Sequence, residues 1–330
     1  MTPAPLFRIQ DLHVRLRHRG GERTLVREVS LSVRSGQSVG LVGESGSGKS
    51  VSIKAAMRLL PRGTRAEGRI AFDGGDVLTL GRRELARYRS REVALIHQDP
   101  RAHINPTRTV GAFLTEGVVH TGQMNRAEAT ERACALMADV GITDAARRLH
   151  QYPHQLSGGL LQRVMIVAAL LPSPRLIFAD EPTTALDVTV QSDVMAILLE
   201  QIRERQVSML FVTHDLDLAA AVTDRLAVMY AGSIVETGPS AEISARPLHP
   251  YTAGLLQCRP STAEVKRLTA IPGRPVAAHE AGTGCSFAPR CPFAVERCRA
   301  ERPHDRSIEG RTVACHRVEE IADRLEERAS

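Results

Sequence analysis

Residues 43–50 read Gly43-Glu44-Ser45-Gly46-Ser47-Gly48-Lys49-Ser50, and the apolar run Val39-Gly40-Leu41-Val42 precedes them. This is the GxxxxGKS pattern of a phosphate-binding loop between a buried strand and a helix. Its glycines let successive backbone N–H groups turn toward one anion, and the helix adds its positive N-terminal end. Lys49 is predicted to reach the terminal phosphates, and Ser50 to offer its hydroxyl to Mg²⁺. By itself, the pattern indicates only nucleotide binding.

A second glycine-rich stretch follows much later in the chain, as Leu156-Ser157-Gly158-Gly159. It has no lysine, so it cannot bind the same phosphates in the way that residues 43–50 do. Ser157 precedes an apolar helical run, which alone is typical of a serine that caps a helix N-terminus. Together, the two glycine-rich stretches suggest a second phosphate-contacting surface that faces another nucleotide.

Unbroken apolar runs at Leu176–Ala179 and Met209–Val212 are typical of central parallel strands, and residues 188–205 predict the helix between them. This alternation indicates a doubly wound α/β sheet, with ligand-binding loops at the carboxyl ends of its strands. Residues 5–40 predict short alternating strands. Residues 100–155 have a helical pattern, which predicts a helical subdomain inserted in the core.

Polar side chains follow three of the predicted strands. Asp180 is expected to orient Mg²⁺ beside Ser50, and Glu181 to polarise the water that attacks the terminal phosphate. Glu181 as a second metal-shell carboxylate is the alternative. Gln98 can hydrogen-bond both Mg²⁺ and that water, and His214 can donate to the γ-phosphate.

Each signal is common when found alone, but their joint order and spacing resemble the ATP-binding-cassette (ABC) family. The resemblance implies an α/β P-loop NTPase fold: a RecA-like core, an antiparallel β subdomain and an inserted helical subdomain. It also implies that two such domains meet head to tail with two ATP molecules between them. The Ser157-Gly158-Gly159 stretch would face the γ-phosphate on the partner's loop, and Asp187 would cross the interface. Hydrolysis would then let the two domains part.

Several further stretches are similar to the ATPase subunits of oligopeptide and dipeptide permeases. They are Gln98-Asp99-Pro100, Asn105-Pro106, Tyr152-Pro153-His154-Gln155-Leu156-Ser157-Gly158-Gly159, Arg163-Val164-Met165-Ile166, Asp180-Glu181-Pro182-Thr183-Thr184-Ala185-Leu186-Asp187-Val188-Thr189 and His249-Pro250-Tyr251-Thr252. The resemblance implies two membrane permease subunits, a paralogous second ATPase as heterodimer partner, and an extracellular solute-binding protein that acts indirectly. The chain is more similar to the first (D-like) of the two ATPases. Import of di- or oligopeptides is implied; nickel or another small solute, and a homodimer, stay open.

The composition changes near residue 255, so residues 1–255 are predicted to form the nucleotide-binding domain, with its helical subdomain at about 100–165. Residues 256–330 are predicted to be a small extension carrying Cys285, Cys291, Cys298 and Cys315. Four thiolates in a core-poor segment suggest Zn²⁺ or an iron–sulfur cluster, although the spacing lacks the paired CxxC of common zinc ribbons. The segment resembles the C-terminal extension of peptide-permease ATPases, which implies a four-iron, four-sulfur cluster with a structural role. Four reduced thiols are the alternative.

The formal charge is +6, from 43 basic and 37 acidic residues. With 3% aromatic residues and no tryptophan, stacking platforms are scarce, so no nucleic-acid partner is expected. The sequence has neither a secretory signal nor an apolar run long enough to span a bilayer. We therefore expect a cytosolic protein that reaches the inner face of the cell membrane through partners.

Three features depart from the resemblance, one of them the unusual stretch Arg101-Ala102-His103 after Gln98. No aromatic residue near Leu16–Gly21 can stack on adenine, so Arg17 or His18 is the candidate. Leu160 and Leu161 stand where polar residues or Met are more usual.

Two other functions compete with peptide import. A soluble ABC-type ATPase not coupled to transport is the main rival, and an unfused exporter ATPase is the third possibility. The short interval of 59 positions (157 − 98) between Gln98 and Ser157 leaves no room for the long coiled-coil insertion of many soluble ABC ATPases.

Overall fold

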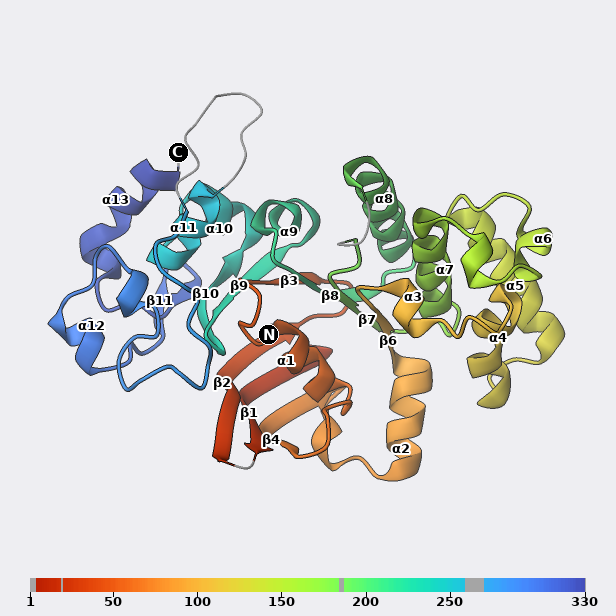
Figure 1. The fold of residues 1–330 in the computed structure, drawn as a ribbon, viewed down its shortest axis with the longest axis horizontal. Helices are drawn as coiled ribbons and strands as arrows, with labels where there is room; N and C mark the ends of the chain where they lie inside the picture. The colour runs from red at the N-terminus through yellow and green to blue at the C-terminus, as the bar shows by residue number, and fades with distance from the viewer. Residues whose placement is uncertain (1–3, 19, 184–186, 259–269, 330) are drawn as a thin grey trace. The chain divides into compact units, whose positions relative to one another are not determined.

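A computed structural model of the chain describes residues 4–18, 20–183, 187–258 and 270–329. The chain forms two compact units (Figure 1). The first unit comprises the described parts of residues 1–33, 38–78 and 211–330, and the second comprises those of residues 34–37 and 79–210. Residues 259–269, near the start of the predicted extension, lie outside the description.

An antiparallel sheet forms the N-terminal part of the first unit. Its strands, in spatial order, are β2 (Gly21–Val33), β1 (Phe7–His18), β4 (Thr64–Phe72) and β5 (Gly75–Asp76). Phe7 and Ile9 are buried on one face of β1, and Ile9 pairs with Leu31 on one side and Ile70 on the other. The alternation of buried and exposed positions therefore gives this sheet one apolar face.

The first unit also holds the strand that leads into the phosphate-binding loop. Within this unit the strand order is β11 (Arg306–Ile308), β12 (Arg311–Val313), β10 (Ser233–Pro239), β9 (Arg225–Tyr230) and β3 (Ser38–Val42). Strands β3 and β9 are parallel, and the remaining pairs are antiparallel. Two strands from the C-terminal segment thus extend the sheet that carries the loop.

The first unit also contains seven described helices. They are α1 (Lys49–Ala56), α9 (Leu216–Val222), α10 (Ser240–Ala245), α11 (Pro250–Gln257), η4 (Ala288–Arg290), α12 (Glu296–Ala300) and α13 (Val318–Ala329). Ala253 of α11 packs with Phe293, Ile321 and Leu325 in one buried cluster, against which Cys291 and Cys315 lie. The C-terminal segment therefore has a core of its own, and α11 contributes to it.

The second unit contains a parallel strand pair and most of the helices. Strands β6 (Val93–Ile96) and β7 (Leu176–Asp180) pair in register, with Val93 opposite Leu176. Its helices are α2 (Arg82–Arg87), η2 (Tyr88–Glu92), α3 (Pro100–His103), α4 (Val110–His120), α5 (Arg126–Asp139), α6 (Ala145–Leu149), η3 (Pro153–Gln155), α7 (Gly158–Leu170) and α8 (Val188–Glu204). Helices α3 to α7 follow one another between the two strands, which is the helical insertion that the sequence predicts.

Two short elements carry the chain from one unit to the other: η1 (Val77–Thr79) and β8 (Ser208–Thr213). All six residues of β8 are buried, as the apolar run at residues 209–212 predicts. Among the residues with a described structure, no helix has the length and apolar character needed to cross a membrane.

Candidate functional site

The phosphate-binding loop turns sharply between β3 and α1. Gly46 and Gly48 have φ values of 79° and 109°, in the left-handed region that glycine tolerates. A Cβ atom on Gly43 would lie 2.1 Å from the backbone oxygen of Met229 in β9. Gly43 is therefore required by the close approach of the loop to β9.

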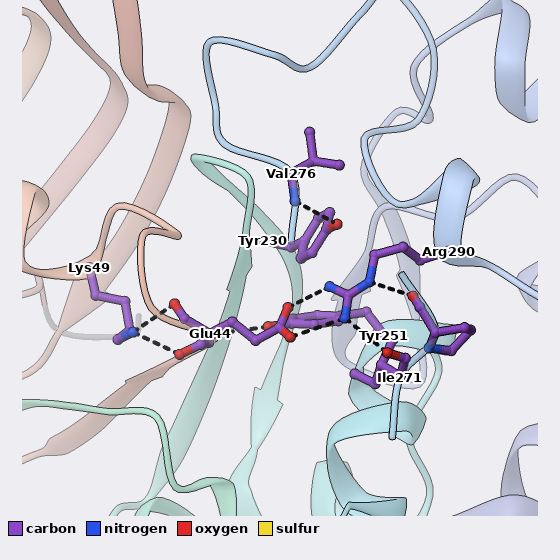
Figure 2. A network of polar contacts seen from close by, with 9 residues as sticks. Glu44, Lys49, Tyr230, Tyr251, Ile271, Val276 and Arg290 are labelled. Carbon is purple, nitrogen blue, oxygen red and sulfur yellow. Dashed lines mark hydrogen bonds and ion pairs between the residues drawn. The ribbon is translucent and has the colours of Figure 1, made fainter. Parts of the chain in front are cut away.

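Lys49 is the first residue of α1 and is only 5% exposed. Its Nζ donates to the backbone oxygens of Gly43 (2.7 Å) and Glu44 (3.0 Å), so the ammonium group lies against the loop itself (Figure 2). The Oγ of Ser47 is buried and has no hydrogen-bond partner within the described structure. A polar ligand atom would satisfy that hydroxyl, which fits a loop built to hold phosphate. Ser50 follows in the first turn of α1 and is half-buried.

In the second unit, parallel pairing of β6 and β7 brings two predicted catalytic residues together. The Nε2 of Gln98 donates to Oε2 of Glu181 over 3.1 Å. Asp180 is the last residue of β7 and is half-buried. Glu181 has a φ of 47°, a strained conformation for a residue with a side chain, and such strain clusters at functional sites.

Ser157 and Asp187 are both exposed residues that cap helices in the second unit. The Oγ of Ser157 accepts a hydrogen bond from Leu160 N (3.3 Å) at the start of α7. The Oδ1 of Asp187 accepts one from Val190 N (3.0 Å) at the start of α8. A Cβ on Gly159 would lie 2.7 Å from Cγ1 of Val190, so this glycine lets the two helices approach. Ser157 is thus a helix N-cap in this chain, as its position before an apolar helical run predicts.

The remaining predicted residues are placed as follows. His214 belongs to the first unit, where it follows β8 and is exposed. The phosphate-binding loop lies in that same unit, whereas Gln98, Asp180, Glu181, Ser157 and Asp187 lie in the second. Thr184, Ala185 and Leu186, which precede Asp187 in the predicted interface loop, lie outside the described residues.

Two residues that contact the loop were not identified from the sequence as site residues. Arg290 pairs with both carboxylate oxygens of Glu44, and the hydroxyl of Tyr251 accepts a hydrogen bond from the Glu44 N–H (Figure 2). The sequence offered only weak signals for them. The stretch 249–252 carries part of the family resemblance, and Arg290 directly precedes Cys291.

All four cysteines of the C-terminal segment line a single small cavity of about 20 Å³, together with Phe287 and Phe293. Burial raises the pKa of Cys291 to about 11 and that of Cys315 to about 12. It also raises the pKa of Cys285. In the described ranges, no group of three or more His, Cys, Asp or Glu residues has the arrangement that holds a metal ion. This arrangement therefore does not show the predicted metal ion or cluster, although all four thiols line the same cavity.

Comparison with known proteins places this geometry in a family. Residues 26–184 match the ABC transporter family, and residues 235–298 match the C-terminal region of oligopeptide/dipeptide transporters. The chain is 41% identical over 318 residues to the oligopeptide transport ATP-binding protein OppD of Escherichia coli (strain K12), covering 96% of this chain and 94% of OppD. The dipeptide transport ATP-binding protein DppD of the same organism is 43% identical over 316 residues, with 94% and 96% covered. The chain belongs to the ABC ATPases, in the family of oligopeptide and dipeptide transport ATP-binding proteins.

Solved structures agree on the fold. The ATP-binding cassette MJ0796, determined as a dimer in a post-hydrolysis state with ADP and Pi, superposes with a TM-score of 0.63 at 25% identity, over 71% of this chain and 98% of MJ0796. The protein cbiO1 of Clostridium perfringens, part of the ABC transporter complex cbiONQ, gives 0.62 at 24% identity, over 73% and 91%. The predicted ABC nucleotide-binding fold is confirmed.

Proposed function

We propose that this chain is the ATP-hydrolysing subunit that energises import of peptides across the cell membrane. The single observation that carries this function is the 41–43% identity to oligopeptide and dipeptide transport ATP-binding proteins over 94–96% of the chain. The loop geometry supports it, because Lys49, the turned glycines and the unpaired Ser47 hydroxyl suit a triphosphate.

Each predicted residue has one part in the proposed chemistry. Lys49 and the loop N–H groups bind the phosphates, and His214 donates to the γ-phosphate. Glu181 accepts a proton from the attacking water, which Gln98 helps to orient. The hydrogen bond between Gln98 and Glu181 supports this pairing of roles. Ser50 and Asp180 are the oxygen donors that would hold Mg²⁺, which supplies charge neutralisation on the phosphates when bound.

The second glycine-rich stretch is proposed to contact the nucleotide of a partner ATPase. Ser157 caps the 13-residue helix α7, which begins at Gly158, and its side chain is exposed. The N-terminal end of α7 favours an anion. Asp187 would cross the same interface. Binding ATP would then join the two ATPases, and hydrolysis would release them.

The partners of this ATPase are proposed to be two integral-membrane permease subunits, with a paralogous ATPase as the second nucleotide-binding subunit. An extracellular solute-binding protein would deliver substrate without touching this chain. The protein would lie at the cytoplasmic side of the membrane, attached through the permease subunits. We propose residues 1–255 as its nucleotide-binding domain and residues 256–330 as the extension.

We also propose that Cys285, Cys291, Cys298 and Cys315 hold a four-iron, four-sulfur cluster with a structural role. Support comes from the gathering of all four thiols around one space, which at about 20 Å³ would have to widen to admit the eight atoms of the cluster. A cluster provides one iron for each thiolate, so it does not need several sulfur atoms to meet at one ion, as Zn²⁺ does. Protein purified without oxygen should contain about four iron atoms per chain. Zinc in place of iron would favour the alternative metal, and the absence of both would leave four reduced thiols.

The function is tested by reconstituting the chain in vesicles with two peptide-permease membrane subunits and a second ATPase of the same family. We expect ATP-dependent uptake of labelled di- and oligopeptides, lost when Lys49 is replaced. Uptake of nickel but not peptides would identify the alternative substrate. ATPase activity without any membrane association would instead support a soluble ABC-type ATPase.

A further inference from the structure

An ion pair between a buried arginine and a half-buried glutamate joins the C-terminal segment to the phosphate-binding loop, across 246 positions of sequence. Arg290 NH1 lies 2.6 Å from Oε2 of Glu44, and NH2 lies 3.1 Å from Oε1. The Arg290 side chain is 3% exposed and that of Glu44 is 24% exposed. Two parallel charge-assisted bonds in a buried setting fix both the distance and the orientation of the carboxylate.

Arg290 is itself held in place by its surroundings (Figure 2). Its Nε donates to the backbone oxygen of Pro272 (2.9 Å), and NH2 also reaches that of Ile271 (3.4 Å). The guanidinium lies over the ring of Tyr230, 5.8 Å from its centroid. Glu44 provides the negative charge in this set of contacts. Arg290 is thus fixed by several contacts, and it can hold the carboxylate of Glu44 in one position, unlike an ion pair between two exposed side chains.

Tyr251 of α11 holds the backbone of the same loop residue. Its hydroxyl accepts the N–H of Glu44 over 2.9 Å. Its ring is buried against Tyr230 and Phe287, at centroid distances of 4.7 and 5.4 Å. Burial raises the pKa of Tyr251, so the phenol stays neutral. The phenol therefore occupies the N–H of Glu44 and fixes the backbone at this point of the loop.

Glu44 is also the residue around which the loop turns. Its backbone oxygen accepts the N–H of Ser47 (3.2 Å) and the ammonium of Lys49 (3.0 Å). Tyr251 and Arg290 therefore act at one end of a short chain of contacts, and the phosphate-binding lysine lies at the other.

We infer that Arg290 and Tyr251 are positioning residues for the phosphate-binding loop, and that they set its affinity for ATP through Glu44. The C-terminal segment is in this way part of the nucleotide site. The inference rests on the proposed ATP-binding role of the loop. Since Arg290 ends η4 between Cys285 and Cys291, the cysteine-bearing segment carries the support.

The experiment measures binding of a fluorescent ATP analogue to the purified full-length chain. In Arg290→Met the Kd is expected to rise about tenfold or more, because a buried charge-assisted bond is lost and Glu44 is left unpaired. Arg290→Lys keeps the charge without the two parallel bonds and should recover part of the affinity. Tyr251→Phe should raise the Kd by a smaller factor. Arg274→Met is the matched control, because it removes the exposed pair of Arg274 with Glu280 (2.8 Å) from the same segment. Its Kd should stay at the wild-type value.

Coupling through Glu44 separates positioning from general stability. Glu44→Gln should raise the Kd as Arg290→Met does, and the double variant should be no weaker than the weaker single variant. If Arg290→Met does not fold, Glu44→Gln and Tyr251→Phe carry the test from the loop side and from α11. Wild-type affinity in both of these variants, or additive losses in the double variant, would overturn the inference. Failure of the wild-type chain to bind the analogue would instead contradict the proposed function itself.

Discussion

The phosphate-binding loop (residues 43–50) and the cysteine-bearing segment (residues 285–315) belong to the same unit but gather their chemical groups differently. In the loop the groups are close together in sequence, and Lys49 donates to the backbone oxygens of Gly43 and Glu44, six and five positions before it. In the cysteine-bearing segment Cys298 comes from α12 and the other three thiols from irregular segments, and all four line one cavity. A site made of neighbouring residues can be recognised as a sequence pattern. A site whose groups are far apart in sequence depends on how the chain packs around it.

The two regions are also physically joined, through Arg290 and Glu44. They also share a sheet, because β12 from the C-terminal segment pairs with β10, β10 with β9, and β9 with β3, which leads into the loop. The groups that bind phosphate are therefore close together in sequence, whereas Arg290, which supports the loop, lies far along the chain. The predictions below separate these two contributions.

The largest effect is expected from Glu181→Gln in the second unit. Loss of the proposed base should lower kcat by about 10²–10⁴-fold while ATP binding is retained. Steady-state phosphate release and nucleotide binding measure the two quantities. Glu200→Gln on the exposed face of α8 is the control and should leave both unchanged. Unchanged turnover in Glu181→Gln would restrict this residue to a role beside the metal.

Replacing Lys49 by Ala tests the local part of the loop. Loss of its charge from the phosphate site should reduce kcat/KM for ATP by about 10²–10³-fold. Lys54→Ala removes an exposed lysine from the same helix and should have wild-type kinetics. Equal kinetics in the two variants would show that the ammonium of Lys49 does not serve the phosphates.

Glu236→Ala tests how strongly the chain after β10 is anchored to its sheet. The carboxylate is 1% exposed and accepts the N–H groups of Leu248 (2.8 Å) and His249 (3.0 Å), just before α11. Removing it leaves two buried donors without partners, which should cost about 3 kcal/mol in the free energy of unfolding. Urea denaturation measures the loss, and Glu296→Ala, at an exposed position, should change stability little. A loss as small as that of the control would mean that water replaces the carboxylate.

The smallest effect on stability is expected at Ser157, where two roles overlap. Ser157→Ala should cost about 1 kcal/mol, because the N-cap of α7 is lost. Ser157→Asp keeps a capping oxygen but adds a negative charge, so it should preserve the melting temperature and still abolish ATP-dependent association with the partner ATPase. Normal association of the Asp variant would leave Ser157 as a helix cap alone.

Much of the fold and part of the site follow from the sequence. The phosphate-binding loop, the buried strands that precede Gln98 and Asp180, and the helical insertion all lie where local patterns predict them. These features depend on residues close in sequence, such as glycines with positive φ and unbroken apolar runs. The meeting of Gln98 and Glu181 follows from one further rule, that neighbouring parallel strands end at the same edge.

The sequence by itself determined that consecutive N–H groups of one loop, with Lys49, form a phosphate site, because that chemistry needs only neighbouring residues. Only the tertiary structure decided that Tyr251 and Arg290 hold Glu44, because these residues lie in α11 and η4, 207 and 246 positions further along the chain. The same holds for the cavity among the four cysteines, whose size depends on side chains that pack from α11, α13 and the loops between them.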